Sequence, residues 1–321
     1  MTTPSDASWR NRLVYLMREI DLFFDATREY KESHEVTATA TLRERNRLAV
    51  WRLRVKGEPF PADWIEEVRD IVGRARAILD NAMFTAVEAT GVTLNSKQRS
   101  AVYFPIAKNA GDWTVFTNSA HAAALSQDTV DALRALQPFV SGSETASMLT
   151  KANNDDKHKK PLTLAMMPDP LFVMDFDVDH GGRDPGKVTV DWFTPARPVA
   201  NGDELARFRS ETAMIATRES KVPVALCIDV AGDWIDIQDF LWDIQILLLD
   251  ASTVLGAVDP ILAEGYRALV VLKRQQLDAF RRMILNNDRA AESEWLEISG
   301  FLNEREQTGN GASLAELLAR D

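Results

Sequence analysis

Six consecutive polar residues, Asn153 to His158, carry the side-chain types that acid, base and phosphate chemistry use. Histidine exchanges a proton near neutral pH, and lysine carries a positive charge that can hold a phosphate. Carboxylate and amide groups can orient both of them. Pro161 follows closely and ends the helix that the preceding residues predict. We therefore predict a polar site at the C-terminal end of a helix.

Helical spacing decides which of these side chains face the same way. Asn154 and His158 are one turn apart, and Lys157 is displaced by one position. We assign candidate catalytic roles to His158 and Lys157, and candidate binding roles to Asn153, Asn154 and Asp156. The structural alternative is a polar helix end, in which Lys157, His158 and the lysines after them complement the negative pole of the helix dipole.

Composition limits the classes of function. The 321 residues include 37 Lys and Arg against 48 Asp and Glu, a net charge of -11 with a pI near 5.0. This balance argues against a broad basic footprint for nucleic acid, although it does not exclude a local basic pocket. The single cysteine, Cys227, excludes an internal disulfide and a zinc site built on cysteine pairs. We predict no metal site and no cofactor.

The sequence also bears on the cellular compartment. The first residues, Met1 to Arg12, lack the apolar core of a signal peptide. No uncharged apolar run reaches the ~18 residues that a membrane-spanning helix requires. We therefore expect a cytoplasmic protein of a bacterial-type cell without a membrane partner.

The elements that must position the polar site are mainly helical in the N-terminal half. Alternating residues predict a β-hairpin over Glu35 to Val55. A long helix opens with Pro61 and stops at Gly91, which is a common helix terminator. Apolar periodicity and capping residues predict helices over Trp9 to Arg28, Pro61 to Gly91, Ser126 to Gln137 and Ser143 to Lys157.

Beyond Pro161 the apolar period changes from helical spacing to two. The predicted strands are Leu162 to Met167, Leu171 to Val178, Lys187 to Phe193 and Val222 to Val230. We therefore expect an antiparallel sheet of about four strands. The helices predicted after it are Ile235 to Val258, Pro260 to Leu285 and Arg289 to Asn303. The order of helices, sheet and helices predicts an α+β fold.

This order suggests three parts of the chain. Residues 1–160 form a mainly helical region that includes the N-terminal β-hairpin. Residues 161–258 form the antiparallel sheet and a packing helix, in the same domain as the first part. Residues 259–321 form a C-terminal helical extension. A chain of this length is near the size at which a single core stops growing.

The stretch from Leu136 to Leu162 resembles a pattern of an uncharacterised bacterial protein family. The pattern consists of a Leu-Gln-Pro-aromatic turn, a helix, and then Asn-Asn-x-Asp-Lys-His. In that family a long upstream helix carries His-Asn-Leu-Arg-Ser-Ala-Leu-Asp-His, which residues 73–81 match in part. The resemblance spans the chain from Trp9 to Gly256. Its Asp-Lys-His part is the most specific.

The complete upstream run is similar to the signature of HEPN ribonucleases. That signature is an arginine five positions before a histidine on one helix. In those enzymes the two residues lie at a helical dimer interface, where the histidine acts in acid or base catalysis and the arginine stabilises the phosphate. Arg76 and Asp80 match that signature, whereas Asn81 replaces the catalytic histidine and Gly73 replaces an earlier one. Because asparagine does not exchange a proton near neutral pH, the resemblance implies binding roles for Arg76 and Asp80 rather than cleavage at Asn81.

Asp80 has candidate partners on its own helix and in the polar stretch from Asn153 to His158. It can orient His158, or it can form an ion pair with Lys157 or Arg76 that fixes how two helices pack. The resemblance implies a HEPN-like binding or interaction module in stress or phage defence. RNA or a nucleotide is then the candidate ligand, and the long helix is the candidate interface of a homodimer.

Two alternatives belong to other classes of function. The first is a metal-independent ribonuclease in which His158 is the base, Lys157 supplies charge for the phosphate and Arg76 positions the substrate. The second is a purely structural assembly protein. Solvent access decides between them, because a nuclease needs these groups exposed and a structural role needs them buried and bonded to one another.

Overall fold

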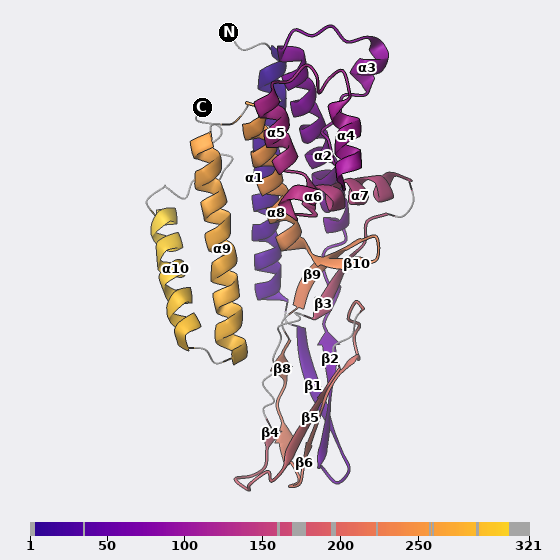
Figure 1. Cartoon of the computed structure of the whole chain (residues 1–321). Coiled ribbons are helices and arrows are strands. Elements are labelled where there is room, and N and C mark those ends of the chain that lie inside the picture. The colour runs from indigo at the N-terminus through magenta and orange to yellow at the C-terminus, as the bar shows by residue number, and fades with distance from the viewer. Residues whose placement is uncertain are drawn as a thin grey trace.

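The computed structural model describes residues 4–34, 36–158, 161–168, 178–193, 197–222, 224–256, 258, 260–286 and 289–307. Within these ranges the predicted α+β fold is confirmed, with helices at both ends of the chain and antiparallel sheets between them. The molecule is elongated: helices gather at one end and a long sheet extends from the other (Figure 1). None of the described helices combines the length and the apolar character that crossing a membrane requires.

The helices form the larger part of the molecule. They are α1 (Pro4–Ser33), α2 (Trp64–Ala89), α3 (Ser96–Ser100), α4 (Ala110–Thr117), α5 (Gln127–Ala135), α6 (Pro138–Ser141), α7 (Thr145–His158), α8 (Ile237–Val254), α9 (Pro260–Asn286) and α10 (Arg289–Gln307). The first turn of α2 holds Glu66 and Glu67, where the helix dipole favours acids. Gly91 follows its end at φ 74°, a left-handed conformation in which glycine stops a helix. The long predicted helix is therefore present, although it begins at Trp64 rather than at Pro61.

The strands form three antiparallel sheets among the described residues. They are β1 (Val36–Arg43), β2 (Leu48–Val55), β3 (Leu164–Pro168), β4 (Val178–Asp179), β5 (Val188–Trp192), β6 (Glu204–Ser210), β7 (Ala216–Thr217), β8 (Ser220–Lys221), β9 (Val224–Val230) and β10 (Asp233–Asp236). The strand orders are β5-β6-β2-β1-β8, β10-β9-β3 and β4-β7. The predicted strands at β3, β5 and β9 are present. However, β5 pairs with β6 and lies in the sheet of the N-terminal hairpin, not in the sheet of β9. Residues 169–177, most of the strand predicted over Leu171 to Val178, lie outside the described residues.

The predicted hairpin is confirmed as β1 and β2, which pair along their full length. The turn between them has an uncommon backbone, because Glu44, Arg45 and Asn46 have φ values of 52°, 55° and 64°. Left-handed conformations of this kind are costly for residues other than glycine. A contact from outside the hairpin holds the turn: the N–H of Met214 donates a hydrogen bond to the carbonyl of Asn46 at 2.7 Å.

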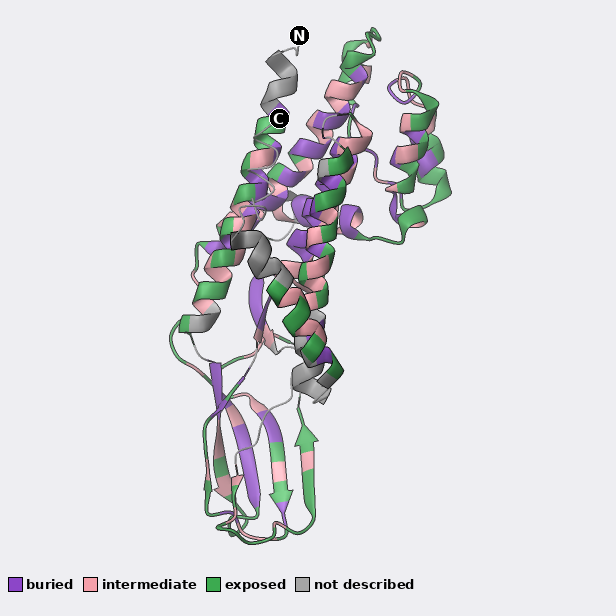
Figure 2. Ribbon diagram, turned by 90° about the vertical axis from the view of Figure 1, so that its left-hand side faces the viewer, coloured by how far each residue is buried: buried purple, intermediate pink, exposed green. Residues whose placement is uncertain are grey.

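Two hydrophobic clusters divide the interior. The larger one lies between the helices and includes Leu79 and Phe104. The smaller one lies on one face of the long sheet and includes Trp51, which is 0% exposed, and Leu53. Figure 2 shows buried residues both between the helices and along the strands of the sheet. We call residues 36–57, 178–193 and 197–222 the sheet arm, and the other described residues the helical body.

Helix α8 begins at Ile237, so the predicted helix start at Ile235 is wrong by two residues. The preceding residues form β10, in which Ile235 lies opposite Ile228 of β9. Asp236 then caps α8, because its side chain accepts a hydrogen bond from the N–H of Gln238 at 2.8 Å. The alternation of β10 is too short to be distinguished from the start of a helix by period alone.

Within the helical body, α9 packs along α8, and α10 packs along α9 (Figure 1). Near this docking surface, the Nε2 of Gln245 in α8 donates a hydrogen bond to the Oδ1 of Asp21 in α1 at 3.3 Å. Gln245 is fully buried. Burial raises the pKa of the Asp21 carboxyl, although the hydrogen bond from Gln245 and the charge of Lys273 in α9 lower it in part. A carboxylate that is costly to ionise therefore lies where these helices meet.

Asp21→Asn is expected to raise the free energy of unfolding at pH 7 by roughly 1 kcal/mol. A raised pKa means that the folded state holds the proton more firmly, so stability declines as pH rises above the unfolded value of 3.8. Asparagine removes this decline and keeps an oxygen for Gln245. Urea unfolding at pH 7 and at about pH 3 should show the gain only at the higher pH. Asp131→Asn, at an exposed position of α5 and not among the groups that act on Asp21, is the control and should show no such gain.

Candidate functional site

The polar stretch from Asn153 to His158 forms the C-terminal part of α7. Asn153 is buried, Asn154 is exposed and Asp156 is partly buried. The side chains of Lys157 and His158 lie outside the described residues. Their predicted catalytic roles therefore stay predictions, and the described geometry concerns the residues around them.

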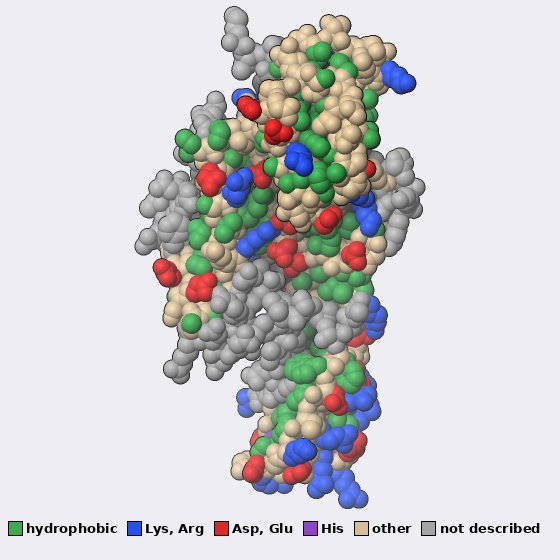
Figure 3. All heavy atoms as spheres, viewed as in Figure 1, with side chains coloured by type: hydrophobic (Ala, Val, Ile, Leu, Met, Phe, Trp, Pro, Cys, Tyr) green, Lys and Arg blue, Asp and Glu red, His purple; other side chains and the backbone are tan. Residues whose placement is uncertain are grey.

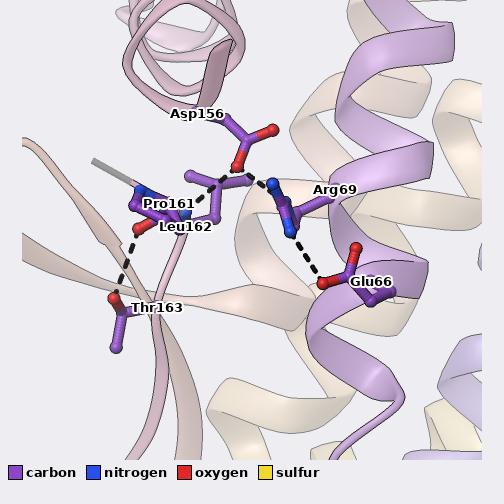
Figure 4. Close-up of polar contacts among 6 residues, drawn as sticks. All are labelled: Glu66, Arg69, Asp156, Pro161, Leu162 and Thr163. Atoms are coloured by element: carbon purple, nitrogen blue, oxygen red, sulfur yellow. Dashed lines mark hydrogen bonds and ion pairs between the residues drawn. The ribbon is translucent and has the colours of Figure 1, made fainter. Parts of the chain in front are cut away.

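Asp156 connects the end of α7 to α2 and to the start of β3 (Figure 4). Its Oδ1 accepts a hydrogen bond from the Nε of Arg69 at 2.6 Å and one from the backbone N–H of Leu162 at 3.2 Å. The Nη1 of Arg69 donates to the Oε1 of Glu66 at 2.7 Å. Hydrogen bonding to Asp156 raises the pKa of the Arg69 guanidinium. Asp156 thus has two internal donors that hold the chain where it leaves α7.

Gly73 of α2 faces Asn153 of α7. A Cβ atom built on Gly73 would lie 4.0 Å from the Oδ1 of Asn153, an ordinary contact distance. Beside this contact is an open pocket of about 370 Å³. Its lining residues are Glu66, Arg69, Asp70, Val72, Gly73, Arg74, Asn153 and Asp156. Because Gly73 has no side chain, it leaves space here that a larger side chain would fill.

Arg76 and Asp80 hold the backbone of Phe104 from both sides. The Nη2 of Arg76 lies 2.8 Å from the Oδ1 of Asp80 and donates to the carbonyl of Phe104 at 3.2 Å. The N–H of Phe104 donates to the same Asp80 oxygen at 3.0 Å. Nη1 of Arg76 also lies 3.5 Å from the Oγ1 of Thr150 in α7. We call this arrangement the Phe104 clamp.

The Phe104 clamp is largely buried. The side chains of Arg76 and Asp80 are 14% and 23% exposed, and the ring of Phe104 belongs to the core of the helical body. Burial lowers the pKa of the Arg76 guanidinium, while the charge of Asp80 and its hydrogen bond act in the opposite direction. Of the alternatives for Asp80, the ion pair with Arg76 is present. This pair fixes how the loop at Phe104 packs on α2.

The packing of α7 on α2 therefore brings part of the predicted site together. Asn153 and Asp156 lie against α2 near Gly73 and Arg69, and Arg76 reaches α7 at Thr150. Asn154 is exposed on the surface of α7. Arg69 belongs to this junction and was not predicted from the sequence. Its position one turn before Gly73 and two turns before Arg76 is a signal that could have identified it.

Comparison of the chain with protein-family models, with curated proteins and with solved structures gave no match. The resemblance to HEPN-like proteins therefore stays a prediction that rests on the sequence. Among the described residues, no group of three or more His, Cys, Asp or Glu side chains could hold a metal ion.

Proposed function

We propose that this protein is a HEPN-like binding module whose polar pocket between α2 and α7 holds a ligand without cleaving RNA. The observation that supports the absence of cleavage is that Arg76 is bonded within the Phe104 clamp, to Asp80 and to the carbonyl of Phe104. An arginine that positions a phosphate presents its N–H groups to that phosphate. Both terminal nitrogens of Arg76 are instead directed at Asp80, Phe104 and Thr150.

The pocket supports a binding role. Ligand sites in proteins are concave and carry a few fixed polar groups. Here Arg69 and Asp156 are fixed by their mutual contact, and Asn153 contributes an amide from a buried position. Gly73 provides the space between the helices. A small polar ligand can meet these groups without any change in the packing of α2 on α7.

Incubation with total RNA tests the absence of cleavage. The purified protein and a His158→Ala variant are expected to degrade RNA equally, at the background rate of the buffer. Degradation by the wild type that the variant lacks would establish the ribonuclease alternative instead. Because His158 is compared with alanine in otherwise identical protein, a contaminating nuclease would affect both samples alike.

Native mass spectrometry tests the binding role. Protein purified under non-denaturing conditions is expected to carry a small molecule, and Gly73→Leu is expected to lose it because leucine fills the pocket. The Cβ atom of the new side chain would lie 4.0 Å from the Oδ1 of Asn153, an ordinary contact distance. Gly265→Leu is the matched control, since Gly265 is also helical and has no atom within 4 Å of its Cβ position. An empty wild-type protein, or a ligand retained by Gly73→Leu, contradicts the proposal.

A further inference from the structure

The charges of this protein are divided unevenly between its two parts. The sheet arm has 13 Lys and Arg against 8 Asp and Glu, a net charge of +5, although the chain has -11. The remaining 24 Lys and Arg against 40 Asp and Glu give the rest of the chain -16. Figure 3 shows the Lys and Arg side chains gathered over the end of the sheet arm. Beyond a Debye length of about 8 Å, salt screens the acidic helical body from this surface.

Arginines share one face of the long sheet. Antiparallel partners point to the same side, and side chains two residues apart along a strand also do. The pairing of β1, β2 and β6 places five arginines together: Arg43, Arg52, Arg54, Arg207 and Arg209. The opposite face carries Trp51 and Leu53, which are buried in the smaller core. We call the outer surface the arginine face.

Internal acids neutralise only part of the arginine face. Glu204 pairs with both Arg52 and Arg207, and Glu44 pairs with Arg209. Asp191 lies opposite Arg207 in the sheet and adds one more carboxylate to this face. Arg43 and Arg54 form no ion pair with any described residue, and Arg54 donates only to the hydroxyl of Thr39. The hairpin turn adds Arg45 and Arg47, which are exposed and likewise have no acidic partner in the described part of the chain. A positive charge therefore remains for an external anion.

An exposed aromatic ring lies beside these arginines. Phe193 follows β5 at the edge of the sheet and is 38% exposed. The guanidinium carbon of Arg207 lies 5.0 Å from the centre of its ring. Trp192, its neighbour in sequence, is 45% exposed and belongs to the opposite side by strand alternation. Arg207 thus lies over one face of the Phe193 ring, and the exposed part of the ring on the arginine face offers a surface on which a nucleobase can stack.

We propose that the arginine face of the sheet arm binds single-stranded nucleic acid. Backbone phosphates lie along Arg43 and Arg54, and an unpaired base stacks on Phe193 beside Arg207. An acidic protein or a nucleic acid duplex could use the charges, but neither presents a free base to Phe193. This surface is distinct from the α2–α7 pocket, so the inference goes beyond the proposed function and either can fail alone.

Fluorescence anisotropy with a labelled oligouridine of about 20 nucleotides tests the phosphate contacts. The variant Arg43→Gln/Arg54→Gln is expected to bind about tenfold more weakly than the wild type. The slope of log K against log salt should be shallower by about 1.4, since each lost phosphate contact accounts for about 0.7 in a single strand. Lys97→Gln/Lys108→Gln makes the same change in charge at exposed positions of the helical body and should keep the wild-type affinity. Equal affinities of the two double variants overturn the proposal.

A second pair of variants tests the stacking contact. Phe193→Ala is expected to weaken oligouridine binding about fivefold or more, because stacking of one base contributes about 1–3 kcal/mol. Trp192→Ala removes an equally exposed aromatic from the other side of the same strand and should have little effect. Circular dichroism checks that each variant is folded. Binding of an RNA duplex or of polyglutamate as tight as that of oligouridine would show a different class of partner and overturn the proposal.

Discussion

Replacement of Arg76 by methionine is expected to lower the free energy of unfolding by about 3 kcal/mol. The substitution removes the guanidinium from the largely buried Asp80 carboxylate, and it leaves the carbonyl of Phe104 without this donor. Loss of a partner from a buried pair is costly because the remaining polar groups stay desolvated. Urea unfolding followed by circular dichroism measures the change.

Arg74→Met is the matched control on the same helix. Arg74 pairs with Glu19, but both side chains are more exposed than those of the Phe104 clamp, so the expected cost is below about 1 kcal/mol. In the double variant Arg76→Met/Asp80→Leu, the total cost should be smaller than the sum of the two single costs. If Arg76→Met costs no more than Arg74→Met, the Phe104 clamp does not stabilise the fold and Arg76 is free for another role.

Trp51→Ala is expected to destabilise the sheet arm by about 4 kcal/mol. Trp51 is fully buried and is the largest side chain of the smaller core, so its removal leaves a cavity between the strands. Because the larger core is built by other residues, we expect the effect to stay mainly in the arm. Hydrogen exchange should become faster in β1, β2 and β6 and change little in α1 and α2.

Leu79→Ala is the reciprocal control, since Leu79 is buried in the larger core. It should accelerate exchange in α1 and α2, with an expected cost of about 3 kcal/mol. If both variants accelerate exchange equally throughout the molecule, the two clusters unfold as one cooperative unit. The expectation that each variant affects mainly its own part of the molecule is then wrong. The comparison therefore measures how far the arm and the body depend on each other.

Local signals account for most of the elements that were predicted. Gly91 ends α2, and Ser126 caps α5 by accepting a hydrogen bond from the N–H of Thr129 at 3.2 Å. The β1–β2 hairpin is equally local, because its strands are joined by one short turn. The partners of that hairpin were not predictable in this way. Arg52 meets Glu204 across 152 residues, and no periodicity in either segment encodes that pairing.

The same limit applies to the candidate site. The motif spacing identified Arg76, Asp80, Asn153 and Asp156 as residues that belong near one another. The spacing did not show that Arg76 and Asp80 would bind the backbone of Phe104 and not the side chains of Asn153 and Asp156. Backbone groups of a loop leave no pattern in the sequence. The basic character of the sheet arm was hidden for a different reason. The net charge of the whole chain, -11, averages the arm with a strongly acidic remainder.

The described residues of the helical body carry 21 Lys and Arg against 32 Asp and Glu, whereas the sheet arm carries a net charge of +5. In an elongated molecule this separation gives a permanent electric dipole along its length. Such a dipole turns a diffusing protein before any contact forms. Near a polyanion, the protein rotates so that the sheet arm faces the polyanion and the acidic helical body faces away from it. Productive encounters then become more frequent than random collisions, and added salt slows association more than dissociation.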